Sequence, residues 1–244
     1  MAVMVITGAS AGIGAAVARA AVGAGWSVAV LARRAEALAA VAAGHPQALC
    51  CPCDVTDSAQ VEAAFDAVIG RFGRVDVLFN NAGVMPRPGT IDTISDADWA
   101  QGLAVNLTGM FNAARAAFAR MCTQDPQGGR IIMNGSVSAQ APRPGSVIYT
   151  TTKHAITGMT KTLALDGRPF GIACGQIDIG NVRTDLAAQI ARGVPQADGS
   201  LRAEPMMDMA AVTEAVLTMA AMPPGANVLQ MTVMASAMPL VGRG

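Results

Sequence analysis

The stretch Val3-Met4-Val5-Ile6-Thr7-Gly8-Ala9-Ser10-Ala11-Gly12-Ile13-Gly14 joins an apolar run to a glycine-rich turn and then to a helical pattern. Consecutive apolar residues, rather than alternating ones, indicate a strand that is covered on both faces, as in a parallel sheet. The glycines let the backbone approach a pyrophosphate, and the helix N-terminus supplies free N–H groups. The stretch therefore predicts a parallel α/β fold that binds phosphate at this turn. A turn whose glycines serve only packing is the alternative.

The rest of the chain repeats this alternation of short apolar runs and longer helical patterns. The predicted strands are Val3–Thr7, Ser27–Ala32, Gln47–Cys53, Val75–Asn80, Gly129–Asn134, Ile172–Asp178 and Asn227–Met231. The predicted helices are Gly12–Ala24, Ala35–Ala43, Ser58–Arg71, Asp96–Cys122 with a bend, Ser146–Asp166 and Met209–Ala221. Because no linker-like change in composition divides the chain, we expect one α/β domain over residues 1–244, with a doubly wound parallel sheet of seven strands.

One stretch interrupts the alternation. Gly193–Pro205 is polar and rich in turn-forming residues, and it follows a short helical pattern at Thr184–Ala191. Long loops in compact domains often serve as lids or binding loops. We therefore predict a substrate loop or lid at residues 184–205, with a mobile surface excursion as the alternative.

The composition limits the class of protein. Hydrophobic residues make up 52% of the 244 residues and charged residues 14%, which favours a large buried core. The formal net charge is zero and no extended basic run occurs, so we expect no nucleic-acid partner. No uninterrupted apolar stretch of about 18 residues occurs, and no charged leader precedes Thr7, so we expect neither a membrane span nor a signal peptide.

The five cysteines indicate a reducing compartment. Cys50, Cys51 and Cys53 form a cluster, whereas Cys122 and Cys174 stand alone. An odd number without the spacing of a disulfide scaffold suits the cytoplasm. A zinc site at the cluster is the alternative, but the chain has no second cysteine pair and only two histidines. We therefore predict buried strand cysteines and no metal.

Two arginines follow the second predicted strand, at the place where ribose selection is made in dinucleotide-binding folds. Acidic residues there bind the ribose hydroxyls of NAD, whereas the guanidinium groups of Arg33 and Arg34 suit the 2′-phosphate of NADP. A helix N-terminus disfavours cations, so their position indicates a bound anion. We predict NADP rather than NAD. The alternative is that both arginines are simply solvated at a helix start. Because position 11 is an alanine, the glycine turn itself offers no basic residue to the phosphate.

Tyr149 is the only tyrosine, and Lys153, one of two lysines, follows it by four residues. On a helix these two side chains share a face. A fixed positive charge favours the phenolate, so we expect Lys153 to lower the pKa of Tyr149. Ser136 lies 13 residues before Tyr149, at the end of a predicted strand.

Five positions at strand ends converge on one edge of the predicted sheet. They are Gly8, Arg33, Asp54, Asn81 and Ser136. In an open parallel sheet, ligands bind beyond the carboxyl ends of the strands. This convergence predicts the binding site more strongly than any single motif.

Taken in order, these motifs resemble the short-chain dehydrogenase/reductase family over nearly the whole chain. The matching segments are Thr7-Gly8-x-x-x-Gly12-Ile13-Gly14, Asp54-Val55, Asn80-Asn81-Ala82-Gly83, Asn106, Ser136 and Tyr149-x-x-x-Lys153. The resemblance implies a Rossmann-type sheet of strand order 3-2-1-4-5-6-7. It also implies hydride transfer between NADP(H) and a carbonyl or alcohol substrate.

The resemblance also implies catalytic roles for four residues. Tyr149 would be the general acid/base, Ser136 would polarise the substrate carbonyl, and Lys153 would hold the nicotinamide ribose. Asn106 would bind a water that links Lys153 to solvent. Ser138 is an alternative to Ser136, and Asn106 could also be a helix-kink residue.

The predicted cofactor contacts follow from the same match. Asp54 would bind the adenine amino group, Val55 would lie beside the ring, and Asn81-Ala82-Gly83 would line the adenosine ribose. The full predicted set is Gly8, Ser10, Gly12, Ile13, Gly14, Arg33, Arg34, Asp54, Val55, Asn81, Ala82, Gly83, Tyr149, Lys153, Gly180, Val182 and Thr184.

The chain departs from the family at one position. The family usually carries Pro-Gly after the sixth strand, with a threonine four residues beyond the glycine. Here Ile179 replaces the proline, while Gly180 and Thr184 match. Isoleucine keeps the backbone groups that bind the nicotinamide amide, so we expect cofactor binding to survive in a less rigid loop.

Two other functions remain open. A 3-oxoacyl-thioester reductase would need a basic patch for an acidic carrier protein, for which Arg115, Arg120 and Arg143 are candidates. A non-catalytic dinucleotide-binding regulator would not need the proton donor Tyr149.

The partners follow from the loops and helices. The loops Met85–Thr90, Gln140–Ile148 and Thr184–Pro205 indicate an apolar small molecule. The resemblance implies a homodimer or homotetramer formed through the Asp96–Cys122 and Ser146–Asp166 helices.

Overall fold

The central sheet of the computed structural model, which describes residues 1–184 and 193–241, has seven parallel strands. Their spatial order is β3-β2-β1-β4-β5-β6-β9, so the predicted order 3-2-1-4-5-6-7 is confirmed. The strands are β1 (Val3–Thr7), β2 (Ser27–Ala32), β3 (Ala48–Pro52), β4 (Val77–Asn80), β5 (Gly129–Asn134), β6 (Ile172–Ile179) and β9 (Gln230–Val233).

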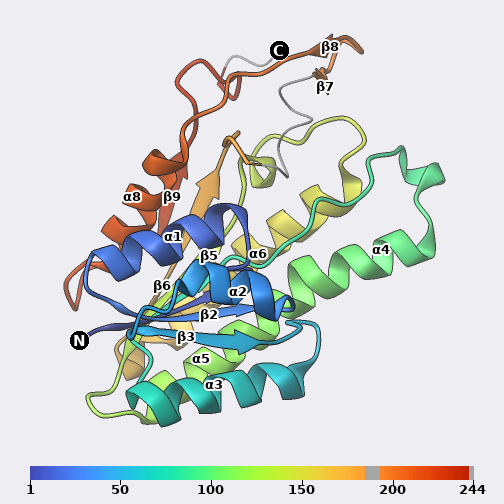
Figure 1. Ribbon diagram of the computed structural model, residues 1–244. Coiled ribbons are helices and arrows are strands. Elements are labelled where there is room, and N and C mark those ends of the chain that lie inside the picture. Colours follow the sequence, from blue (N-terminus) through green and yellow to red (C-terminus); the bar gives the residue numbers. More distant parts are fainter. Residues whose placement is uncertain (185–192, 242–244) are drawn as a thin grey trace.

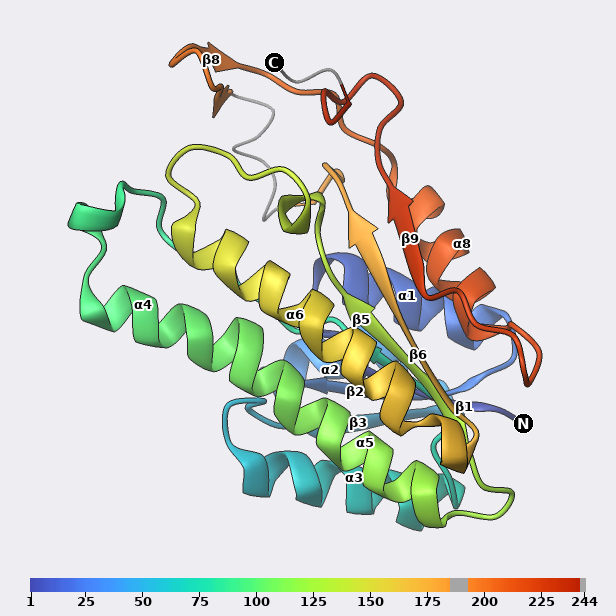
Figure 2. The same ribbon diagram turned by 180° about the vertical axis from the view of Figure 1, so that it is seen from behind.

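Helices cover both faces of this sheet, as Figures 1 and 2 show from opposite sides. The helices are α1 (Gly12–Gly23), α2 (Ala35–Ala42), α3 (Ser58–Phe72), α4 (Asp96–Leu103), α5 (Met110–Thr123), α6 (Val147–Asp166) and α8 (Met209–Ala220). One apolar cluster joins the sheet to α1, α2 and α8, and a second joins it to α3, α5 and α6.

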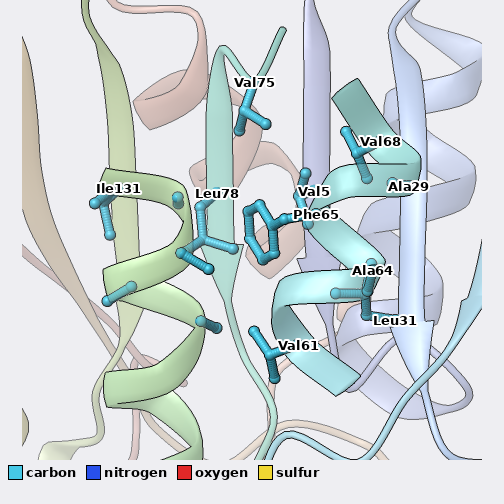
Figure 3. Close-up of a cluster of buried hydrophobic side chains, with 14 of the residues drawn as sticks. Val5, Ala29, Leu31, Val61, Ala64, Phe65, Val68, Val75, Leu78 and Ile131 are labelled. Carbon is cyan, nitrogen blue, oxygen red and sulfur yellow. The ribbon is translucent and has the colours of Figure 1, made fainter. Parts of the chain in front are cut away.

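This two-sided cover explains the unbroken apolar runs of the central strands. All five residues of β1 are buried. On the α3 side, Phe65 is fully buried among side chains that include Val5 and Leu78 (Figure 3). Full burial of such a side chain contributes about 1.5–3 kcal/mol to stability.

The predicted bend in the Asp96–Cys122 helix is a single π-helical segment. α4 begins after Ser95, whose hydroxyl accepts a hydrogen bond from the Asp98 N–H at 3.1 Å. A π-helix over Ala104–Gly109 then separates α4 from α5. Such segments frequently occur at functional sites, and this one contains Asn106.

Four strand predictions differ from the structure at their ends: β3 and β6 by no more than one residue at an end, and β4 and β9 by more. β4 begins at Val77 rather than Val75, because the backbone N–H and C=O of Val75 pair with the side chain of Gln124. β9 begins at Gln230 rather than Asn227. The amide of Asn227 instead donates to the Cys174 carbonyl at 2.7 Å, which holds the preceding turn.

The Gly193–Pro205 stretch contains a small antiparallel hairpin of β7 (Val194–Pro195) and β8 (Leu201–Arg202). Figure 1 shows this hairpin standing away from the main sheet. The short helix predicted at Thr184–Ala191 lies outside the described residues after Thr184. None of the helices in the described ranges is long and apolar enough to cross a membrane.

The cysteine cluster lies on β3 and the residue that follows it. Cys51 and Cys53 are buried and Cys50 is partly exposed. Burial raises the pKa of Cys51 and of Cys53 to about 11. Within residues 1–184 and 193–241, no three His, Cys, Asp or Glu side chains are placed to hold a metal ion.

Candidate active site

The predicted site residues gather around one pocket at the carboxyl ends of the strands. Those that line it are Gly8, Ser10, Gly12, Ile13, Arg33, Arg34, Asp54, Val55, Asn81, Ala82, Gly83, Ser136, Tyr149, Lys153, Gly180, Val182 and Thr184. Gly14 and Asn106 are not part of the lining.

The glycine turn allows a close approach of three backbone segments. Gly8 has φ +66°, and a Cβ there would lie 2.8 Å from the Cα of Ala82. A Cβ on Gly14 would lie 2.5 Å from the Gly8 carbonyl oxygen and 2.7 Å from the amide nitrogen of Asn81. Ala11, at the N-cap of α1, offers no side-chain cap, so the helix N-terminus remains available to an anion.

Gly14→Ala should lower both stability and cofactor affinity, because the new methyl group meets the Gly8 carbonyl and the side chain of Asn81, which is itself hydrogen-bonded. Overpacking of this kind costs about 1–3 kcal/mol. Thermal unfolding and titration with NADPH would measure the two losses. Gly23→Ala is the matched control on the same helix, since nothing lies within 4 Å of its added Cβ. Equal stability of the two variants would contradict this account of the turn.

The end of β4 is joined to the end of β1 by Thr7. Its hydroxyl accepts hydrogen bonds from the N–H groups of Asn81 at 2.8 Å and Ala82 at 2.9 Å. The amide of Asn81 donates to the Thr7 carbonyl at 2.9 Å. These bonds fix residues 81–83 beside the glycine turn.

The two arginines after β2 lie at the N-terminus of α2 and are exposed. Arg34 donates to the Ser10 hydroxyl at 3.1 Å. Neither Arg33 nor Arg34 forms an ion pair with any described residue. Asp54, on the same side of the pocket, accepts hydrogen bonds through one carboxylate oxygen from the Thr56 N–H and hydroxyl.

Ser136, Tyr149 and Lys153 meet at the other end of the pocket. Ser136 follows β5, and the other two residues lie on the first turns of α6. The Ser136 side chain lowers the pKa of Tyr149 as a hydrogen-bond partner. The Ser138 N–H donates to the Ser136 hydroxyl at 3.1 Å. The Lys153 ammonium donates to the Asn134 carbonyl at 2.7 Å and lies 5.5 Å from the centre of the Tyr149 ring.

The electrostatics of this group differ from the sequence expectation. Burial is the largest influence on Tyr149 and raises its pKa, while the Ser136 hydrogen bond and the charge of Arg143 lower it. Burial also lowers the pKa of Lys153 to about 8, and Asp178 opposes that shift.

Asn106 is fixed by a two-point contact with the backbone. Its side-chain oxygen accepts from the Val84 N–H at 2.8 Å, and its amide donates to the Val84 carbonyl at 2.9 Å. Asn106 therefore ties the π-helix to the segment after β4, beside the pocket. Its predicted water link to Lys153 stays a prediction.

Comparison with known proteins decides the family. The model of the short chain dehydrogenase family matches residues 2–194. The chain belongs to the short-chain dehydrogenase family. It is an oxidoreductase of that family, whose named relatives are dehydrogenases and reductases of alcohol and carbonyl groups.

Individual relatives agree with this assignment. The 3beta-hydroxysteroid dehydrogenase of Mediterraneibacter gnavus is 35% identical over 179 residues, which are 72% of this chain and 64% of that relative, slightly under two thirds of its length. A 3-ketoacyl-(acyl-carrier-protein) reductase from Brucella melitensis, complexed with NADH, superposes with a TM-score of 0.86 at 24% identity over 97% of this chain and 98% of that one. An alcohol dehydrogenase from Thermococcus sibiricus, complexed with 5-hydroxy-NADP, superposes with a TM-score of 0.83 at 25% identity over 98% of each chain.

The sequence did not place three residues beside the group of Ser136, Tyr149 and Lys153, although it pointed to one of them, Arg143, as a candidate for a carrier-protein patch. They are Asn134, at the end of β5, Asp178, near the end of β6, and Arg143, in the segment before α6. Arg143 pairs with Glu204 and donates to the Asn181 side chain at 2.9 Å. The two strand residues are polar side chains near the carboxyl ends of largely apolar strands, which is the signal that could have revealed them.

The residues present fit a bound dinucleotide. The glycine turn forms a cradle that side chains would fill. The side-chain oxygen of Asn134 is buried in the pocket lining and finds no hydrogen-bond donor among the described residues. A buried acceptor without a donor is costly, and a sugar hydroxyl of a bound cofactor would satisfy it.

Proposed function

We propose that this short-chain dehydrogenase transfers a hydride between NADP(H) and a small carbonyl or alcohol substrate. The observation that carries the proposal is that Ser136, Tyr149 and Lys153 line one pocket, with the Lys153 ammonium 5.5 Å from the centre of the Tyr149 ring. These groups share a pocket with the glycine turn and the arginine pair.

The side chains have the chemistry that carbonyl reduction needs. When bound, the nicotinamide supplies the hydride to the carbonyl carbon. Negative charge then builds on the carbonyl oxygen, and the two hydroxyls of Ser136 and Tyr149 stabilise it. Tyr149 gives its proton to that oxygen to complete the alcohol. Lys153, largely protonated below its pKa of about 8, would hold the nicotinamide ribose.

The preference for NADP rests on the arginine pair. Arg33 and Arg34 are exposed, line the pocket and form no ion pair with described residues. A 2′-phosphate would supply the missing anion. The remaining predicted contacts, from Gly8 to Thr184, are proposed to hold the rest of the dinucleotide.

The proposal is tested with a panel of aldehydes and ketones, by measuring the oxidation of NADPH and, in parallel, of NADH. We expect turnover with part of the panel and a higher kcat/KM with NADPH. Absence of turnover with every carbonyl, and with the matching alcohols in the reverse direction, would favour the regulator.

The 3-oxoacyl-thioester reductase alternative needs a basic patch for an acidic carrier protein. The arginines that could form this patch already contact other residues of the chain. Arg120 pairs with Glu62 and with Asp66, and Arg143 pairs with Glu204. Arg115 lies over the Phe111 ring, 5.3 Å from its centre. No structural observation therefore favours the 3-oxoacyl-thioester reductase.

We propose that the substrate is mainly apolar. Met85, Val137 and Val182 line the pocket near the catalytic group. The segment 193–205 would contribute to the substrate side, because its Glu204 contacts Arg143 and accepts from the Asn181 amide at 2.8 Å. The carbonyl panel should then show lower KM values for apolar ketones than for polar ones of the same length.

We further propose a homodimer or homotetramer in a reducing cytoplasm. Trp99 on α4, Phe111 on α5 and Leu165 on α6 are exposed apolar side chains on the helices that the family resemblance assigns to the interface. All five cysteines are free. Light scattering after size exclusion should give two or four chain masses, and a mass of one chain would contradict this proposal.

A further inference from the structure

Asp178 is a fully buried carboxylate at the end of β6, directly below the catalytic group. One of its oxygens accepts from the Ser136 N–H at 3.0 Å and from the Gln176 amide at 2.6 Å. The other oxygen accepts from the amides of Gln140 at 2.9 Å and Gln230 at 3.0 Å. Four donors from three segments, the turn at 136–140, β6 and β9, therefore hold one carboxylate.

The chain leaves room for this carboxylate next to the catalytic serine. A Cβ on Gly135 would lie 2.1 Å from the Asp178 oxygen, so any other residue before Ser136 would displace it. Asp178 forms no ion pair with a described residue. Among the described residues, this buried carboxylate is held by hydrogen bonds rather than by an ion pair.

The negative charge of Asp178 influences the pKa values of Tyr149 and Lys153. Within the described part of the chain, Asp178 from β6 and Arg143 from the segment before α6 are the charged groups that influence Tyr149, and Asp178 alone influences Lys153. Burial raises the pKa of Tyr149, and Asp178 raises it further. Burial lowers the pKa of Lys153, and Asp178 opposes this. In both cases the carboxylate favours the protonated form.

We propose that Asp178 is a positioning residue, whose carboxylate fixes the backbone at Ser136 and supplies the buried negative charge that keeps Tyr149 and Lys153 protonated. The inference rests on the proposed function for its catalytic meaning. The charge effect itself can be measured without a substrate, because Tyr149 is the only tyrosine in the chain.

The test is a titration of the tyrosinate absorbance in the wild-type protein and in Asp178→Asn. Asparagine has the same size, and the Gln140 and Gln230 amides can turn to accept from its new N–H groups. The variant should ionise Tyr149 at a pH lower by about one unit, the order expected for removal of a charge several ångströms away. Lys153 has a pKa of about 8, so it is already neutral in the alkaline pH range in which Tyr149 ionises. A change in the pKa of Lys153 therefore does not reverse the expected downward shift of the Tyr149 midpoint.

Gln230 offers a second pair of variants that leaves Asp178 in place. Gln230 is exposed on the edge strand β9, so its replacement spares the core. In Gln230→Lys, an ammonium would neutralise the Asp178 charge and shift the midpoint in the same direction as Asp178→Asn. Gln230→Ala removes the same hydrogen bond without adding charge, and its midpoint should stay at the wild-type value.

The outcomes separate this inference from the proposed function. A midpoint in Asp178→Asn at or above the wild-type value overturns the inference, whatever the enzyme reduces. Should that variant fail to fold, equal midpoints for Gln230→Lys and Gln230→Ala overturn it instead. In an active enzyme, the fall of kcat for carbonyl reduction at alkaline pH should begin at a lower pH in Asp178→Asn than in the wild-type protein.

Discussion

Phenylalanine at position 149 is expected to lower kcat for carbonyl reduction by about 10²–10⁴-fold, the range of a positioned general acid. The variant keeps the ring, beside which the Lys153 ammonium lies 5.5 Å from the ring centre, so the cofactor side of the pocket should hold its shape. It loses the hydroxyl that is hydrogen-bonded to Ser136, and with it the proton for the alkoxide. NADPH affinity should therefore stay essentially unchanged.

Steady-state rates with the preferred carbonyl, together with a fluorescence titration of NADPH, measure the two quantities separately. Thr151→Ala is a matched control on the same helix, because Thr151 is exposed and lies outside the pocket lining. Retention of the wild-type rate by Tyr149→Phe would show that another group donates the proton. Loss of NADPH binding would show that the variant disturbs the pocket rather than the chemistry.

Replacement of both Arg33 and Arg34 by alanine is expected to raise KM for NADPH by about 10²-fold and to leave KM for NADH nearly unchanged. Each charge-assisted hydrogen bond to a phosphate contributes about 1.5–3 kcal/mol, and the double variant removes the cations nearest to the predicted 2′-phosphate site. The double variant also loses the hydrogen bond from Arg34 to Ser10, which is a residue of the glycine turn.

The ratio of kcat/KM for the two cofactors is the measurement, since it cancels general damage to the fold. Arg19→Ala is the control, because Arg19 is exposed on α1 and does not line the pocket. An equal loss with NADPH and NADH would mean that the arginines bind the shared part of the dinucleotide. No loss with either would leave them as solvated side chains.

The fold could be predicted largely because its central strands are covered on both faces. β1, β2 and β5 begin and end where the sequence predicted, since their apolar runs end abruptly at glycine or polar residues. The edge strand β9 alternates between exposed and partly buried residues. Its limits are set by pairing with β6, where Gln176 lies opposite Gln230, and a pairing partner cannot be identified from a local pattern.

The candidate site also has features that the sequence predicts and features that only the tertiary structure shows. The sequence by itself determined the family resemblance, which implied the strand order, and it named the candidate residues for the chemistry. It could do so because the spacing of Ser136, Tyr149 and Lys153 and the glycine turn are local features. Only the tertiary structure decided the electrostatics of that site. The spacing of Tyr149 and Lys153 predicted a lowered pKa for Tyr149, whereas its pKa in the structure is raised. Burial dominates, and Arg143 and Asp178 act from distant parts of the chain. Burial and charge depend on everything that packs around a group, and the fold alone brings those residues together.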